Sequence, residues 1–292
     1  MAVRAHRPWG RRAGGAPALL AAELPPQALG LAWLGQAGFL LRYGALRIMV
    51  DPYLSDHLAV KYAGQAFSHE RLMPPPLKAE SVRGLDWVAC THRHGDHMDP
   101  GSLGVLARNS PSCRFVVPRA EREAAVKAGV PAQRMALLNA GESLTCAAGL
   151  VITALAAAHE TFALNERGEH PFLGYLFRFG EHAVYHGGDG VVYDGLAARL
   201  REAGVGLALL PVNGRSAQLT RRGIPGNMDF DEARQLCLEA GIPRLVPHHF
   251  GMFAFNTADP SLLARGSADS WLSRLDVTLP DPAEYLVADL SD

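Results

Sequence analysis

The chain of 292 residues is 48% hydrophobic and 20% charged, which is the composition of a globular protein with a large buried core. Its 28 basic and 29 acidic residues nearly cancel, which argues against nucleic acid or an acidic membrane surface as a partner. Four widely spaced cysteines argue against a disulfide framework or a cysteine zinc site and favour a reducing compartment, the cytoplasm.

The organisation of the chain is predicted to be simple. No apolar run approaches the roughly 18 residues needed to cross a bilayer, so we expect a soluble protein. Residues 1–25, with several arginines among small residues, are predicted to form a poorly ordered N-terminal tail. Because no repeat or low-complexity linker divides the rest, residues 26–292 are predicted to form a single domain.

The first half of this domain is predicted to open with strands. Three apolar runs, separated by turns, have the pattern of an antiparallel meander at residues 29–33, 38–42 and 46–50. Asp51 ends the third run, and the prolines at 74–76 require a loop. A strand at residues 87–90 leads into Thr91 and His92, and a helix is predicted at residues 119–128, stopped by Gly129.

In the second half, predicted strands again end where polar residues begin. The strand at 150–155 leads to His159, and the paired strands at 173–179 and 182–185 lead to Asp189. Helices and strands then alternate, with helices predicted at 192–203 and 230–240 and strands at 207–210 and 245–246. Asp229 and Glu232 form a capping-box pattern at the start of the second helix, which Gly241 ends.

The strongest chemical signal follows the strand at 87–90. The segment contains three imidazoles and one carboxylate within six residues: His92, His94, Asp96 and His97. At a strand end, side chains two residues apart can turn toward one point, and imidazole with carboxylate is a ligand set that zinc, manganese or iron accepts. A solvated polar turn is the alternative, but loops seldom gather these residue types so densely. The segment therefore predicts a metal site.

With these residues the chain resembles the metallo-β-lactamase superfamily, whose signature H-x-H-x-D-H they match. The later ligands of that family are matched in chain order by His159, Asp189 and His249. The resemblance runs from about Leu31 to Phe253. Within the superfamily, the segments 33–39, 50–55, 211–215 and 247–253 are similar to the branch of ascorbate-phosphate lactonases and, more loosely, to N-acyl-phosphatidylethanolamine phospholipase D.

This resemblance implies an α/β (α+β) fold, the αββα four-layer sandwich, with two divalent metal ions. Zinc or manganese is expected, and iron is also compatible with the ligands. By the family pattern, His92, His94 and His159 would hold one metal, Asp96, His97 and His249 the other, and Asp189 would bridge them. Two neighbouring cations lower the pKa of a shared water toward about 7, so the resemblance implies hydrolysis by a metal-bridged hydroxide. Asp96 and Asp189 would be its catalytic residues, with Asp96 orienting or deprotonating the water.

Several neighbouring residues have two interpretations. Asp51 would either orient a metal-binding histidine or cap the turn that follows it. Asn213 and Arg215 follow a strand and could contact substrate, although Arg215 could also be a plain surface arginine. His248 is a further candidate substrate contact. His186 and His248 are both compatible with purely structural roles, and Arg221 and Arg222 are predicted to be a solvated surface pair.

The function expected from the resemblance is hydrolysis of a lactone, a cyclic ester, in a small polar substrate. A phosphodiesterase with the same dinuclear site is the alternative hydrolase. A metal-binding or biosynthetic protein that retains the fold without hydrolysis is the alternative of another class. We expect a small-molecule substrate, no nucleic acid and no membrane partner; a homo-oligomer is compatible with the sequence.

Overall fold

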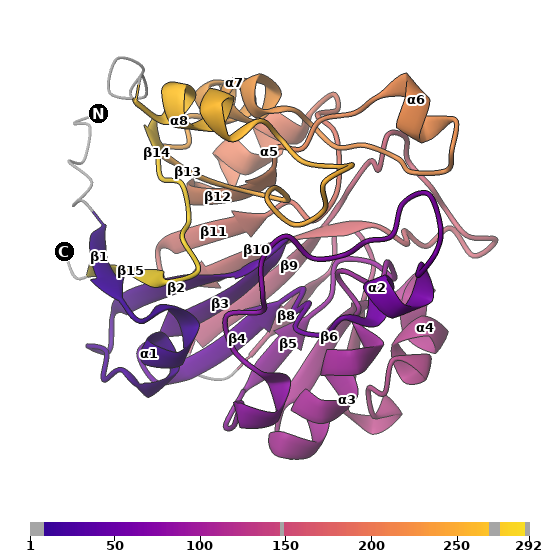
Figure 1. Ribbon diagram of the computed structural model, residues 1–292. Coiled ribbons are helices and arrows are strands. Elements are labelled where there is room, and N and C mark those ends of the chain that lie inside the picture. Colours follow the sequence, from indigo (N-terminus) through magenta and orange to yellow (C-terminus); the bar gives the residue numbers. More distant parts are fainter. Residues whose placement is uncertain (1–8, 147–148, 269–274, 290–292) are drawn as a thin grey trace.

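A computed structural model describes residues 9–146, 149–268 and 275–289. Within them, two β-sheets pack face to face and helices cover both outer faces, as Figure 1 shows. The αββα arrangement implied by the resemblance is thereby confirmed. Among the described helices, none combines the length and apolarity that a bilayer crossing requires.

The first sheet contains eight described strands in the order β1-β15-β2-β3-β4-β5-β6-β7. Strands β1 to β4 and β15 pair antiparallel, whereas β4, β5, β6 and β7 run parallel, so their carboxyl ends lie at one edge. The strand bounds are β1 Gly10–Ala13, β2 Ala28–Gly35, β3 Gly38–Tyr43, β4 Leu46–Val50, β5 Trp87–Ala89, β6 Arg114–Pro118, β7 Met135–Leu138 and β15 Glu284–Asp289.

The second sheet contains seven described strands in the order β14-β13-β12-β11-β10-β9-β8. Here β8 to β11 are antiparallel and β11 to β14 are parallel. The strand bounds are β8 Ser143–Thr145, β9 Leu150–Ala156, β10 Leu173–Phe179, β11 His182–His186, β12 Val205–Pro211, β13 Arg244–His248 and β14 Asp276–Val277.

Most of the helices form the two outer layers. Buried side chains of α1, α3 and α4 pack on the first sheet, and those of α5, α7 and α8 pack on the second. The short helices α2 and α6 lie on the same side of the molecule in Figure 1. The helix bounds are α1 Gly15–Ala21, α2 His57–Lys61, α3 Pro100–Asn109, α4 Arg122–Lys127, α5 Leu196–Glu202, α6 Ala217–Thr220, α7 Phe230–Ala240 and α8 Pro260–Ala268, with 3-10 turns η1 Ala79–Ser81, η2 Arg119–Glu121 and η3 Ala132–Arg134.

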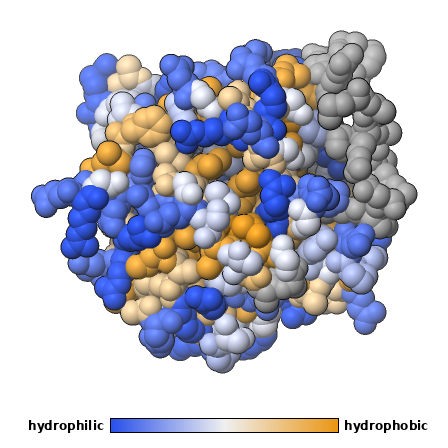
Figure 2. Space-filling view, turned by 180° about the vertical axis from the view of Figure 1, so that it is seen from behind, coloured by the Kyte–Doolittle hydropathy of each residue, from blue (hydrophilic) through white to orange (hydrophobic). Residues whose placement is uncertain are grey.

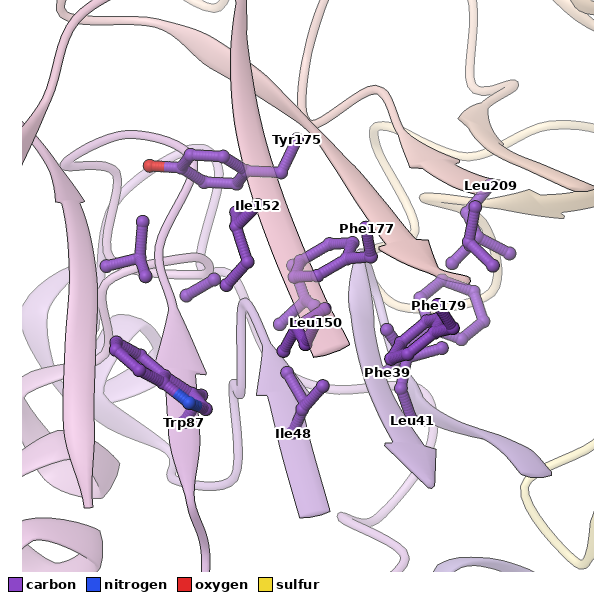
Figure 3. Packing of buried hydrophobic residues seen from close by; sticks show 14 of the residues in the cluster. Phe39, Leu41, Ile48, Trp87, Leu150, Ile152, Tyr175, Phe177, Phe179 and Leu209 are labelled. Carbon is purple, nitrogen blue, oxygen red and sulfur yellow. The ribbon is translucent and has the colours of Figure 1, made fainter. Parts of the chain in front are cut away.

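The main core lies between the two sheets. Phe39 and Ile48 of the first sheet pack there against Phe177 and Phe179 of the second, and all four are fully buried (Figure 3). Each such side chain contributes about 1.5–3 kcal/mol relative to an exposed position. On the surface, hydrophilic residues surround an apolar group near the centre of the face in Figure 2. The inter-sheet core holds the strand ends, and hence the loops that follow them, at fixed positions.

Most predicted elements are confirmed. The meander corresponds to β2, β3 and β4, and the later predicted strands correspond to β5, β9, β10, β11, β12 and β13. The capping box of α7 is present, and Gly241 ends the helix in a left-handed conformation. The helix predicted at 192–203 is wrong at its start, because Gly195 adopts a φ of 88° and α5 begins only at Leu196. Helix α3 was not predicted, although Asp99 before Pro100 is a typical helix start.

The prediction of a poorly ordered tail over residues 1–25 is wrong for the part that the structure describes. Residues 10–13 pair with β15, and α1 buries Ala16 and Leu19 against the first sheet. Arg42 of β3, itself buried, donates hydrogen bonds to the carbonyl oxygens of Leu19, Leu20 and Ala22 at 2.8, 3.1 and 3.2 Å, which satisfies the end of the helix. Residues 1–8 lie outside the described residues.

Replacing Arg42 should therefore destabilise the protein through this N-terminal segment. We expect Arg42→Met to lower the free energy of unfolding by about 2–4 kcal/mol, because carbonyl groups left buried without a donor cost about 1–3 kcal/mol each. Urea unfolding measures the change. Arg12→Met, at an exposed position of β1, is the control and should stay within about 0.5 kcal/mol of the wild type. Equal stability of the two variants would show that α1 is not held by Arg42.

Candidate metal centre

The predicted metal ligands all follow strand ends at the edge where the two sheets meet. The loop after β5 carries four of them, and single residues follow β9, β11 and β13. The structure brings together all seven, in two groups whose ligand atoms lie within 4.8 Å of one another: His92, His94, His159 and Asp189, and Asp96, His97 and His249. This is the division into two half-sites that the resemblance implies.

The carboxylate of Asp189 lies between the two groups. Its Oδ2 is 3.9 Å from His92 Nε2 and 3.8 Å from His159 Nε2. Its Oδ1 is 3.3 Å from Nε2 of both His97 and His249. Each oxygen thus faces a different pair of imidazoles.

The donor atoms at the centre fit a pair of divalent cations. His92 Nε2, His97 Nε2 and Asp189 Oδ1 are buried and have no hydrogen-bond partner within the described chain. Buried polar atoms are almost always paired, so several orphaned atoms that face one another indicate a missing partner. Divalent cations would satisfy nitrogen and carboxylate donors together, and the set suits zinc, manganese or iron.

The protonation states at neutral pH differ among the candidate ligands. Burial lowers the pKa of His94 to about 4 and holds the pKa of His92 well below its ordinary value. Burial alone would raise the pKa of the Asp189 carboxyl, but His249 and His97 outweigh it and hold that pKa well below the usual range. At neutral pH His92 and His94 therefore present neutral imidazoles and Asp189 a carboxylate. Burial by itself lowers the pKa of His97, but Asp189, Asp51 and Asp96 outweigh it and hold that pKa well above its ordinary value, so His97 must lose a proton when metal binds.

Asp51 orients one of the ligands, which decides between its two interpretations. Its Oδ2 lies 2.7 Å from His97 Nδ1 and accepts a hydrogen bond from Thr91 Oγ1 at 2.7 Å, while Oδ1 accepts from the Thr91 amide at 2.8 Å. All three residues are buried. A carboxylate on Nδ1 fixes the ring so that Nε2 points at Asp189 and increases the basicity of that nitrogen.

Gln36 is a site residue to which the sequence assigned no role. It lies in the turn between β2 and β3, and its Nε2 donates to Asp96 Oδ2 at 2.8 Å and lies 3.1 Å from His249 Nε2. Its segment, residues 33–39, is part of the resemblance to the lactonase branch, and Gln36 itself stands between two glycines directly after a predicted strand. The Gln36 amide orients Asp96. The side chain of Asp96 is more exposed than that of Asp189, the other candidate carboxylate ligand.

Three residues around the site have left-handed backbone conformations, which residues other than glycine rarely adopt. Gln36, Asp51 and His249 have φ values of 49°, 46° and 61°. Such residues cost about 1–3 kcal/mol each and cluster where function requires a fixed geometry. Two of these residues are joined by a hydrogen bond, since the His249 amide donates to the Gln36 carbonyl at 2.9 Å.

The turn that presents Asp189 depends on its neighbours. His186 is buried, with Nε2 2.8 Å from the Ala37 carbonyl oxygen and Nδ1 accepting from the Gly188 amide at 3.1 Å. Gly188 has a φ of 60°, and a Cβ there would lie 2.9 Å from the Cβ of Thr91. His186 therefore has a structural role, and residue 188 must be glycine for Asp189 to reach both groups.

None of the three predicted substrate contacts lines the metal-site pocket. His248 is fully buried, stacks on His186 at 4.9 Å between ring centroids and lines no part of the metal-site pocket. Arg215 forms two hydrogen bonds to the carboxylate of Glu232, at 2.6 and 2.5 Å, and so braces the start of α7. Asn213 donates a hydrogen bond to Asn256 of the metal-site pocket at 2.8 Å, and both Asn213 and Arg215 line a smaller neighbouring pocket of about 190 Å³.

A pocket of about 550 Å³ opens above the metal ligands. Five of the ligands contribute to its floor: His94, Asp96, His159, Asp189 and His249. The segment that follows α2, the segment that follows α6 and the loop after β13 form its walls, which include Tyr62, Phe67, Arg222 and Phe255. Arg222, predicted to belong to a solvated pair, therefore belongs to the pocket, whereas Arg221 is absent from its lining.

Comparison with known proteins defines the class. Residues 46–250 match the family model of the beta-lactamase superfamily domain. The match covers more than half of the chain and includes all seven candidate ligands. The chain belongs to this superfamily.

Individual relatives agree with that assignment. The chain is 29% identical over 247 residues to a UPF0173 metal-dependent hydrolase of Aeropyrum pernix, covering 79% of this chain and 86% of that protein. It is 29% identical over 115 residues to an N-acyl-phosphatidylethanolamine-hydrolyzing phospholipase D of Caenorhabditis elegans, covering 38% and 31% of the two chains. A metallo hydrolase from Ignicoccus hospitalis shares the fold with a TM-score of 0.66 at 19% identity, over 91% of this chain and all of the other.

If Asp51 orients His97, its substitution should weaken metal binding more than folding. We expect Asp51→Asn to lower metal affinity by about 10–100-fold, the usual effect of losing a carboxylate behind a histidine ligand. Competition of the apoprotein with a chromogenic chelator measures it. Asp99→Asn is the matched control, because Asp99 is also buried and accepts several hydrogen bonds, at the start of α3, but touches no candidate ligand. Similar metal affinities for both variants would rule out the orienting role.

Proposed function

We propose that this protein is a dinuclear metal-dependent hydrolase that opens the lactone ring of a small-molecule substrate. The observation that carries the proposal is the carboxylate of Asp189, whose two oxygens face separate pairs of imidazoles. Bound at these groups, two divalent cations would acidify water and stabilise negative charge on the substrate oxygen. The donors favour zinc or manganese, with iron as a further candidate.

The chain's own groups would hold the water and the substrate. Burial by itself raises the pKa of Asp96, but His97 and His249 lower it, so the carboxylate is ionised at neutral pH. The Gln36 amide donates a hydrogen bond to Asp96 Oδ2, and Asp96 contributes to the pocket floor. Asp96 would therefore orient the attacking water and accept its proton. Asp189 would keep the two half-sites in register.

The second candidate is phosphodiester hydrolysis at the same site. It is favoured by the similarity to a phospholipase D over 115 residues and by the basic side chains at the pocket mouth. The same groups would act on phosphorus instead of a carbonyl carbon. We also propose a cytoplasmic location, which is supported by four free cysteines, three of them buried.

A substrate panel with metal control separates these reactions. We expect purified protein loaded with zinc or manganese to hydrolyse lactones, to lose that activity with a chelator and to regain it when metal is restored. His94→Ala should lower kcat/KM by more than about 100-fold, because even groups that only orient metal ligands are worth about 10–100-fold.

Each other outcome has a definite meaning. Cleavage of phosphodiesters without lactone turnover would replace the first candidate with the second. Metal-loaded protein that turns over neither class would overturn both and indicate a protein that keeps the fold without hydrolysis. Full activity of His94→Ala would contradict the ligand assignment.

A further inference from the structure

Five aromatic residues line one wall of the metal-site pocket, which is more apolar surface than a small polar substrate would contact. Tyr62 and His69 stack at 4.4 Å between centroids, and His69 meets Phe253 and Phe255 edge-on at 5.0 and 4.7 Å. Phe67 adds a contact to Phe255 at 4.9 Å. All of these rings line the pocket. Such walls bind flat, apolar groups, and a pocket of about 550 Å³ lies within the roughly 300–1,000 Å³ typical of sites for sizeable organic ligands.

The mouth of the same pocket is basic. Lys61, Arg93 and Arg222 line it and are exposed, and the only carboxylates among the described lining residues are the metal ligands Asp96 and Asp189. Within the described residues, neither Lys61 nor Arg222 forms an ion pair, and Arg93 approaches Glu121 only to 3.9 Å. The net charge of the whole chain is -1, so this local excess of positive charge is a property of the pocket.

The basic groups lie directly against the aromatic wall. The Lys61 ammonium is 4.9 Å from the centroid of Tyr62, and the Arg222 guanidinium is 5.6 Å from that of Phe67. A ligand whose ring lies on the wall would therefore place a neighbouring anionic group within reach of these cations. The metal ligands at the floor would face the remaining end of the same molecule.

We infer that the substrate is an aromatic or similarly flat apolar ester or lactone that carries an anionic group, with its ring on the Phe67–Phe255 wall and its anion at Arg222 and Lys61. This inference rests on the proposed function for the reacting bond, but the recognition of ring and anion does not depend on that bond. It replaces the expectation of a small, wholly polar substrate with a more specific class.

Equilibrium binding of three simple probes to the metal-loaded protein tests the inference apart from turnover. Phenylpropionate has a ring and a carboxylate, phenylpropionamide has the ring alone, and butyrate has the carboxylate alone. Calorimetry should show the tightest binding for phenylpropionate. Arg222→Glu should weaken phenylpropionate binding by about tenfold or more, because like charges brought together cost upwards of 1.4 kcal/mol, and should leave phenylpropionamide unchanged.

Arg221→Glu is the matched control, since it makes the same charge change at the adjacent exposed position outside the pocket lining. It should leave the binding of all three probes unchanged. Equal binding of butyrate or phenylpropionamide, or equal effects of the two glutamate variants, would overturn the inference. If the predicted binding order holds but no lactone is hydrolysed, the pocket assignment stands and the proposed reaction fails.

Discussion

The structure depends on one carboxylate that must face two groups of imidazoles at once. Asp189 reaches His92 and His159 with one oxygen and His97 and His249 with the other. Four loops from two different sheets must therefore end within a few ångströms of one side chain. The packed core between the sheets makes this possible because it fixes the strand ends from which these loops start.

Much of the remaining local structure serves that requirement. Gly188 admits the turn that presents Asp189, His186 holds the turn by hydrogen bonds, and Asp51 directs His97 toward it. The left-handed backbone at Asp51 and His249 costs free energy that the surrounding sheets offset. Gly188, His186 and Asp51 do not line the pocket, yet they determine where its ligands lie.

The sequence predicted the ligands better than their surroundings, for a physical reason. The strands and the dense His92 to His97 segment are local signals that can be found along the chain. The resemblance to the superfamily supplied the other three candidate ligands, His159, Asp189 and His249, and the stacking of the two sheets. Contacts between distant segments leave no local pattern: Arg42 on α1, Gln36 on Asp96 and the aromatic wall around Phe255 arise only when the sheets pack. For the same reason the sequence did not indicate that Arg215 pairs with Glu232 or that His248 stacks on His186.

The most direct test of the central claim is anomalous X-ray diffraction from crystals of the zinc- or manganese-loaded protein. The account predicts two anomalous peaks, one on each side of the Asp189 carboxylate, with His92, His94 and His159 around one and Asp96, His97 and His249 around the other. A single peak, or two peaks of which one does not contact Asp189, would contradict a dinuclear site bridged by this residue.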